Sequence, residues 1–249
     1  MDLHFEEHGQ GGPTLVLLHG LSVNGASFAP LLAHLDWPGR VIVPDLRGHG
    51  RSPHATNYSY GGHAADVADL LSPGEEVHVV GHSMGGAVGL VLGSGLFGVD
   101  VKRVTGFGIK LTWTAEEEAK ARAMAQAEVR GFDDRTAAEE RFLKVTGLAG
   151  RGDEVPACVA AGVHEENGRY RLSADMAASL VVGPPVAQLF EVCRAPVHLA
   201  RGEADRMVTL EEMRAFDPDA ENLEGAGHNA HVDRPDALAR LIEKIHLGH

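Results

Sequence analysis

The sequence predicts an α/β fold in which a doubly wound, mostly parallel sheet carries a helical insertion. Two observations lead to this prediction: short apolar runs that are closed by Gly or Pro, and helix-like stretches that lie between them. Apolar runs without polar alternation are typical of strands buried on both faces of a parallel sheet. Alternation of strand and helix implies right-handed crossovers, and ligands of such sheets bind beyond the carboxyl ends of the strands. The residues that directly follow each run are therefore the first candidates for a functional site.

The expected elements follow one another in a regular order along the chain. Strands are predicted at residues 14–18, 41–43, 77–80 and 197–200. Helices are predicted at residues 25–35, 63–71, 85–96 and 237–245. The last of these helices is amphipathic, with apolar residues on one face only.

A segment of different character interrupts this pattern. Residues 112–187 are predicted to be helical and are rich in Ala, Glu and Arg near their start. The tetrapeptides 114–117 and 136–139 both match a helix capping box. Because the strand pattern resumes afterwards, we expect a helical cap at 112–187, inserted into one core domain made of residues 1–111 and 188–249. An independent second domain is the less favoured alternative.

The composition limits the classes of function. The chain has 249 residues, of which 44% are apolar, as expected of a globular protein with one large domain or two small ones. A formal net charge of −13 disfavours a nucleic-acid partner, because phosphate binding needs clustered Lys and Arg. The only two cysteines, Cys158 and Cys193, lack metal-ligand spacing and are expected to be reduced thiols.

No secretory signal and no apolar run of membrane-spanning length is visible in the sequence. We therefore expect a cytoplasmic protein that acts on a small molecule, without a membrane partner, metal or cofactor. Its expected oligomeric state is a monomer or a homodimer.

The strongest functional signal is Gly81-His82-Ser83-Met84-Gly85, which follows a predicted strand and opens a predicted helix. This is a G-x-S-x-G motif in the strand–turn–helix context that the motif requires. Such a sharp turn forces its central residue into an unfavourable backbone region and brings the flanking residues close together, so Gly81 and Gly85 must lack side chains. Ser83 is the expected nucleophile, and the helix that follows would favour developing negative charge.

A serine hydroxyl needs a neighbouring base, and position in the chain selects one of the 15 histidines. His228 follows Gly227 in a loop between the last short apolar stretch and the last helix, at the strand-end face of the sheet. His231 lies three residues further on and is the main competitor. His82 adjoins the nucleophile, but the turn directs its side chain elsewhere. His228 is the expected base.

The base in turn needs a buried carboxylate that fixes its tautomer and stabilises its charged form. Glu203 and Asp205 both follow the strand at 197–200 and lie between Ser83 and His228 in the chain. This gives the order Ser, Asp or Glu, His that is typical of α/β-hydrolases. Asp205 is preferred because it lies deeper in the loop, where its side chain can reach the histidine.

Taken together, these residues resemble a capped serine hydrolase of the α/β-hydrolase fold over nearly the whole chain. The resemblance rests on these motifs: residues 19–21, 45–52, 81–86, 202–205 and 227–228. It implies a cap between the sixth and seventh strands and a structural role for residues 45–52. It also implies an oxyanion hole made by the backbone N–H groups of Leu21 and Met84. The loop at 108–111 carries no acid, which supports Asp205 as the acid of the triad.

The expected activity is hydrolysis of a carboxylic ester, lactone or thioester of a small, partly apolar substrate, through an acyl-enzyme. Phe28, Lys110, Trp113 and His231 are expected to line the substrate pocket; for Lys110 a solvated strand end is an equal alternative. Three other functions stay open: carbon–carbon bond hydrolysis of a ring-opened diketone, cofactor-free perhydrolysis, and a non-catalytic small-molecule receptor. A serine nucleophile excludes the dehalogenase and epoxide hydrolase chemistry of this fold, which uses a carboxylate.

Overall fold

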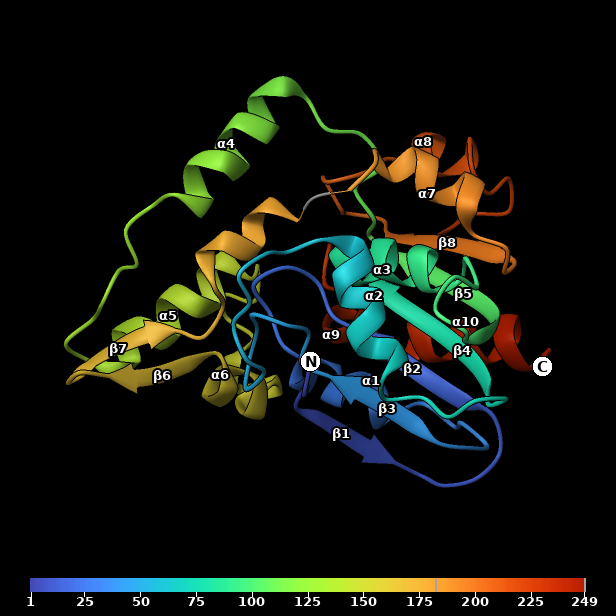
Figure 1. Cartoon of the computed structure of the whole chain (residues 1–249), viewed down its shortest axis with the longest axis horizontal. Helices are drawn as coiled ribbons and strands as arrows, with labels where there is room; N and C mark the ends of the chain where they lie inside the picture. The colour runs from blue at the N-terminus through green and yellow to red at the C-terminus, as the bar shows by residue number, and fades with distance from the viewer. Residues whose placement is uncertain (182, 249) are drawn as a thin grey trace.

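A computed structural model describes residues 1–181 and 183–248 (Figure 1), and its centre is a seven-stranded sheet. The strand order is β1-β3-β2-β4-β5-β8-β9. The edge strand β1 is antiparallel to β3, and each of the other pairs is parallel. The predicted doubly wound, mostly parallel sheet is confirmed. Its strands are β1 (Phe5–His8), β2 (Thr14–Leu18), β3 (Val41–Pro44), β4 (Glu76–His82), β5 (Asp100–Phe107), β8 (Val197–Gly202) and β9 (Glu221–Leu223).

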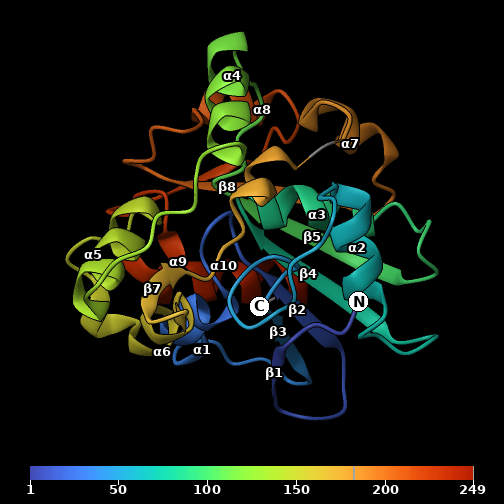
Figure 2. The same cartoon turned by 60° about the vertical axis from the view of Figure 1, so that its left-hand side comes forward.

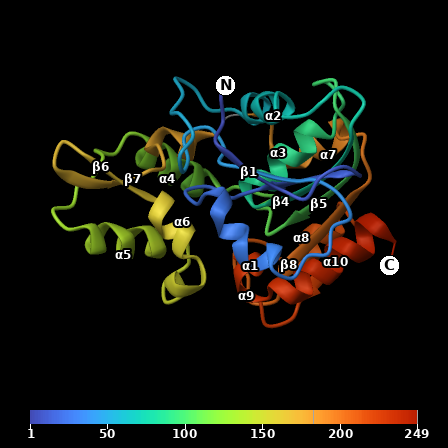
Figure 3. The ribbon, with the colours of Figure 1, turned by 90° about the horizontal axis from the view of Figure 1, so that it is seen from below.

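Helices cover both faces of this sheet, as Figure 3 shows edge-on. One apolar core lies between the sheet and a first group of helices: α2 (Tyr60–Ala68), α3 (Met84–Leu92), α7 (Val186–Val192) and α8 (Leu210–Arg214). A second core lies under elements on the other face: η1 (Gly25–Phe28), α1 (Ala29–Leu32), α9 (Ala230–Asp233) and α10 (Pro235–Leu247). The sheet is thus buried on both sides, which explains why β2 and β3 are uninterrupted apolar runs.

The C-terminal helix α10 shows how the sequence fixes one of these layers. Pro235 occupies its first turn, Gly248 follows its end with a φ of 76°, and both are common at those positions. Leu238, Leu241 and Ile242 lie on one face of the helix and are buried against the sheet. Even this helix has only 13 residues, and no helix in the described part of the chain is long and apolar enough to cross a membrane.

The order of the strands determines where a ligand can bind. β3 and β4 follow β2 in the chain but lie on opposite sides of it. The winding of the sheet therefore reverses between β2 and β4, and the crevice at such a reversal is the usual ligand site of an open α/β sheet. The residues that leave the carboxyl ends of β2 and β4 are His19 and Ser83, respectively.

The inserted segment lies between β5 and β8, which pair with each other in the sheet. These are the fifth and sixth strands of the described sheet in chain order, whereas the resemblance implies an insertion after the sixth strand of the family's sheet. The segment is also not purely helical. It contains α4 (Ala115–Ala125), α5 (Arg135–Val145), η2 (Gly152–Glu154), α6 (Pro156–Ala161), β6 (Val163–Glu166), β7 (Arg169–Leu172) and η3 (Met176–Leu180).

The hairpin β6–β7 is the part of this segment that the prediction missed. Its turn is Asn167-Gly168, with φ values of 53° and 75°. Asn-Gly turns with two positive φ values match the twist of antiparallel strands, so this dipeptide was the available signal for a hairpin.

The two predicted capping boxes have different outcomes. The Thr114 box is confirmed, with Glu117 and Thr114 bonding reciprocally at the start of α4. The Thr136 box is wrong, because Asp134 is the N-cap of α5 and accepts a hydrogen bond from the Ala137 amide at 3.1 Å. An aspartate is a better N-cap than a threonine, and the helix therefore begins at Arg135, one residue before Thr136.

The inserted segment has an apolar core of its own, and this core extends onto the main domain. Phe132, Phe142 and Cys158 belong to it, together with Val23 from the loop after β2 and Val232 from α9. The helix α4 does not take part, because it has no buried residue. Figures 1 and 2 show α4 apart from the sheet and beside η3.

Candidate active site

Ser83 lies in the turn between β4 and α3, with φ 50° and ψ −114°. In the described residues, positive φ values outside glycine occur at Ser22, Ser83 and Asn167. Two of these three residues lie at the carboxyl edge of the sheet, since Ser22 is in the loop after β2. Backbone of this kind costs free energy and persists only where the surrounding structure holds it, so strain is concentrated at this edge.

The glycines of this turn confirm the predicted steric requirement. A Cβ atom at Gly81 would lie 2.5 Å from the carbonyl carbon of Gly85. A Cβ atom at Gly85 would lie 2.2 Å from the carbonyl oxygen of Leu18, at the end of β2. In both cases the obstructing atoms belong to the backbone, so the turn closes around Ser83 only with glycine at both positions.

His228 and Asp205 form a hydrogen-bonded pair. The Nδ1 atom of His228 lies 2.9 Å from Oδ2 of Asp205. The Asp205 side chain is fully buried and its Oδ1 accepts a hydrogen bond from the Met207 amide at 2.8 Å, whereas 28% of the His228 side chain is exposed. Gly202 allows the two loops to meet, because a Cβ atom there would lie 2.0 Å from the carbonyl oxygen of Gly227.

The other candidates for these two roles lie elsewhere. Glu203 is exposed, and its Oε2 accepts a hydrogen bond from the Gly225 amide at 3.4 Å. His231 is fully buried, and among the described residues its ring nitrogens have no hydrogen-bond partner. The carboxylate beside His228 is therefore that of Asp205.

The backbone of Phe107 and Gly108 connects Ser83 to this pair. The Ser83 amide donates to the Phe107 carbonyl at 2.9 Å. A Cβ atom at Gly108 would lie 3.2 Å from Nδ1 of His228 and 3.3 Å from Oδ2 of Asp205. Ser83 and the pair are thus gathered around one strand end, although within the described residues no hydrogen bond joins the Ser83 hydroxyl to His228. In enzymes such bonds tighten in the substrate complex.

His82 has a structural role that the sequence did not reveal. Its side chain is buried, and its Nε2–H group donates to the carbonyl oxygen of His228 at 2.9 Å. Its ring lies 4.6 Å from the ring of His228, measured between centroids. The residue before the candidate nucleophile therefore holds the backbone of the candidate base.

The two amides expected to form an oxyanion hole lie next to Ser83. Met84 is the first residue of α3, and Leu21 follows Gly20, at which a Cβ atom would lie 3.3 Å from the Ser83 Cβ. Among the described residues, neither the Leu21 nor the Met84 amide donates to another protein group.

The residues predicted to line the pocket divide into two pairs. Lys110 is half-buried, with Nζ 2.8 Å from Oε1 of Glu117 and 5.4 Å from the Trp113 ring centroid, and 45% of Trp113 is exposed. Phe28 and His231 are instead fully buried, with ring centroids 4.8 Å apart. The prediction is wrong for these two, because their side chains pack into the core below the loops that carry them.

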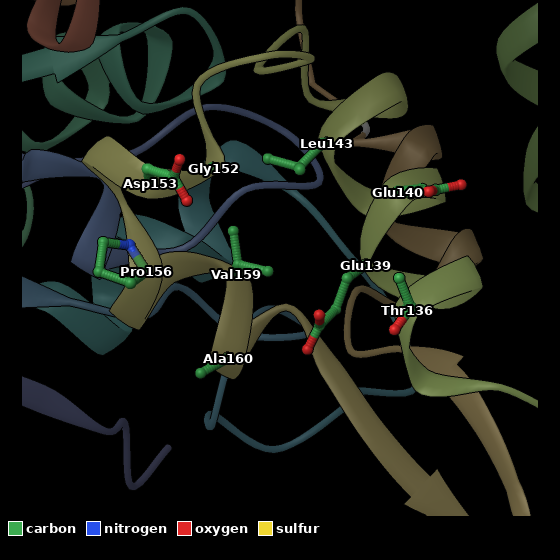
Figure 4. A pocket seen from close by; sticks show the side chains of 9 residues that line it. All are labelled: Thr136, Glu139, Glu140, Leu143, Gly152, Asp153, Pro156, Val159 and Ala160. Carbon is green, nitrogen blue, oxygen red and sulfur yellow. The ribbon is translucent and has the colours of Figure 1, made fainter.

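A cavity of about 340 Å³ lies within the cap, and residues between 136 and 160 line it (Figure 4). It opens between α5 and the segment formed by η2 and α6, and it does not include Ser83 or His228. Its lining is formed by Thr136, Glu139, Glu140, Leu143, Gly152, Asp153, Pro156, Val159 and Ala160. It is therefore not the expected substrate pocket.

Several other histidines surround the site, and burial keeps them neutral. Desolvation lowers the pKa of His19 to about 4, and the pKa values of His49, His63 and His231 to about 3. It also lowers the pKa of His82 well below the ordinary value of 6.5. These imidazoles are thus uncharged packing groups, and they do not add positive charge around Ser83.

Comparisons with known proteins agree with this architecture. A family model described as "Alpha/beta hydrolase family" matches residues 15–241. Lipase LipV of Mycobacterium tuberculosis is 29% identical over 262 aligned residues, which cover 97% of each chain. A solved esterase from M. tuberculosis superposes with a TM-score of 0.77 at 21% identity, covering 100% of this chain and 92% of that one. A solved E-2-(acetamidomethylene)succinate hydrolase has a TM-score of 0.77 at 24% identity and covers 97% and 94% of the two chains.

The substitution Gly81→Ala tests the packing of the turn. The added methyl group meets backbone atoms, so the free energy of unfolding is expected to fall by about 1–3 kcal/mol. Gly61→Ala is the matched control, because a Cβ atom there meets nothing within 4 Å and alanine favours the helix by up to about 1 kcal/mol. Urea unfolding measures both changes, and equal stability of the two variants would contradict the steric account.

The buried histidines predict a loss of stability in acid. Their folded-state pKa values are lowered, so the unfolded chain takes up protons below about pH 6.5 while the folded chain does not. Stability is fully present above that pH and is lost as the pH falls towards 3, by about 1.4 kcal/mol per pH unit for each such histidine. His63→Gln should flatten the slope by one proton, whereas substitution of the exposed His34 should not change it. A free energy of unfolding that stays constant from pH 7 to pH 5 would refute this.

Proposed function

The chain belongs to the alpha/beta hydrolase family, and on this premise we propose that it is a serine hydrolase that acts on a carboxylic ester-type bond. The expected substrates are esters, lactones or thioesters of small, partly apolar acyl groups. The observation that carries the proposal is the His228–Asp205 hydrogen bond of 2.9 Å, beside a serine held at φ 50° on a turn that only glycines can flank.

In the first half of the reaction, the Ser83 oxygen attacks the substrate carbonyl carbon and its proton passes to Nε2 of His228. The carboxylate of Asp205 accepts the Nδ1–H hydrogen bond, which leaves Nε2 free as the base and stabilises the imidazolium that forms. The alkoxy, thiolate or ring oxygen then leaves with that proton, and Ser83 carries the acyl group. In the second half, water gives a proton to His228 and attacks the acyl carbon, and Ser83 regains its proton.

The negative charge on the carbonyl oxygen requires donors that are already in place. The amides of Leu21 and Met84 are assigned this role because both flank Ser83 and both are free to donate among the described residues. The start of the nine-residue helix α3 adds its positive end at the same point. In enzymes from which one such donor has been removed, the activation barrier rises by about 3 kcal/mol.

The choice of an ester-type bond rests on the relatives. Lipase LipV aligns over 97% of both chains, and its name refers to the cleavage of lipid esters. The fold alone leaves the bond open, since the E-2-(acetamidomethylene)succinate hydrolase shares it. The exposed Trp113 and the half-buried Lys110 at the end of β5 would give a pocket of mixed polarity, which suits a partly apolar acyl group.

Ser83→Ala and Asp205→Asn test the proposed triad with p-nitrophenyl acetate and butyrate as substrates. Loss of the nucleophile should lower kcat by at least about 10⁴-fold, and loss of the carboxylate by about 10³–10⁴-fold, because the imidazole then adopts the wrong tautomer. Glu203→Gln is the matched control in the same loop and should retain the parent kcat.

Labelling by a fluorophosphonate provides an independent measurement of the same assignment. The parent protein and Glu203→Gln should be labelled, whereas Ser83→Ala should not be. Thermal melting of each variant separates chemistry from folding, since Ser83→Ala should melt close to the parent. Equal turnover by the parent and Ser83→Ala would show that Ser83 is not the nucleophile.

A further inference from the structure

The loop that carries His228 is in contact with a short stretch of the cap, residues 146–151. The Asn229 amide nitrogen Nδ2 donates to the carbonyl oxygens of Thr146 at 3.0 Å and Gly147 at 3.3 Å. Val232 belongs to the apolar core of the cap. Arg151 donates through Nη2 to the Val232 carbonyl at 2.8 Å. Polar and apolar contacts therefore link the cap to the residues that directly follow His228.

Asp233 connects this contact to the other side of His228. Its Oδ2 accepts a hydrogen bond from the Gly227 amide at 2.8 Å, directly before His228 in the chain. Its Oδ1 lies 2.8 Å from Nη1 of Arg151. The carboxylate thus links α9 back to the residue before His228, and the guanidinium of Arg151 holds the carboxylate.

Arg151 is itself held in one orientation. Its Nη2 atom lies 2.7 Å from Oε2 of Glu154, and its Nε atom also bonds the Glu154 carboxylate. A planar guanidinium that binds two carboxylates and one carbonyl has few other orientations, so it can fix Asp233 more firmly than a flexible ammonium could.

We propose that Arg151 is a positioning residue for His228, and that it acts from the cap through the carboxylate of Asp233. The inference rests on the proposed function, in which His228 is the base. Three groups hold this histidine. Asp205 binds its ring, His82 binds its carbonyl oxygen, and Asp233 binds the amide of the preceding residue, Gly227. The third is the only one of these that depends on the cap.

The consequence for catalysis follows from geometry. Without Arg151, the Asp233 carboxylate gains freedom to turn towards water, and the Ala226–Gly227 peptide, whose N–H group this carboxylate binds, loses its fixed orientation directly before His228. A misplacement of about 1 Å can cost about 10²-fold in rate. Because Arg151 touches no reacting atom, its loss should lower kcat and leave KM for a small ester nearly unchanged.

The experiment compares Arg151→Met with Arg135→Met in the full-length protein. Arg135 is a matched control, because it is also a cap arginine with a 2.7 Å ion pair, to Glu139, and it does not touch the His228 loop. With p-nitrophenyl acetate, and with active sites titrated by a fluorophosphonate, Arg151→Met should lower kcat about 10-fold and change KM less than twofold. Arg135→Met should match the parent in both constants.

A double-mutant cycle tests whether Arg151 acts through Asp233. Asp233→Ala should lower kcat at least as much as Arg151→Met, and the double variant should be no slower than Asp233→Ala alone. The low-field proton resonance of the His228–Asp205 hydrogen bond should broaden or shift in Arg151→Met and remain in Arg135→Met. Arg151→Lys keeps a positive charge that can pair with Asp233, so it should recover part of kcat. If Arg151→Met does not fold, Arg151→Lys is compared with Arg135→Met instead.

Three outcomes would overturn the inference. These are an unchanged kcat in Arg151→Met and Arg151→Lys, a loss in Arg135→Met as large as in Arg151→Met, or independent, multiplying losses in the cycle. Failure of the proposed function is a different result, because the parent protein would then show neither ester turnover nor labelling of Ser83.

Discussion

The hydrogen bond between His228 and the buried carboxylate of Asp205 is the interaction on which the arrangement of the site depends. The two residues leave different strands, β9 and β8, and meet because Gly202 lets the loops approach to backbone contact. A buried carboxylate without a partner is costly, so the pairing also stabilises the loops that carry it. Ser83 is brought to the same place independently, by the turn after β4. The Phe107 carbonyl binds the Ser83 amide, and the next residue, Gly108, lies beside the His228–Asp205 pair.

The inserted segment contributes more than a cover over the sheet. Its stretch from Thr146 to Arg151 touches the loop of His228 through hydrogen bonds and an ion pair, whereas α4 has no buried residue. The inserted segment therefore has two parts with different contacts: one is bonded to the residues that follow His228, and the other, α4, contacts η3. The same contacts would link docking of the first part to the alignment of His228 that we propose.

The sequence predicted the sheet, the turn at Ser83 and the pairing of His228 with Asp205 because each has a local or ordered signal. Buried strands are uninterrupted apolar runs, the turn requires Gly81 and Gly85, and the acid lies between nucleophile and base in the chain. The prediction failed for Phe28 and His231, because nearness to a motif does not tell on which side of a loop a side chain packs. His82 and Arg151 could not be singled out from the sequence, because their contacts join segments that are far apart in the chain; Arg151 and Asp233, for example, are separated by 82 positions.

If Ser83 is the nucleophile, it forms a covalent acyl-enzyme, and mass spectrometry of rapidly quenched reactions detects this species most directly. The parent protein is mixed with p-nitrophenyl acetate for one turnover, quenched in acid and digested. We expect the added mass of one acetyl group on the peptide that contains Ser83, formed as fast as p-nitrophenol is released. Release of p-nitrophenol with that peptide unmodified, or with the acetyl group on another residue, would contradict this expectation.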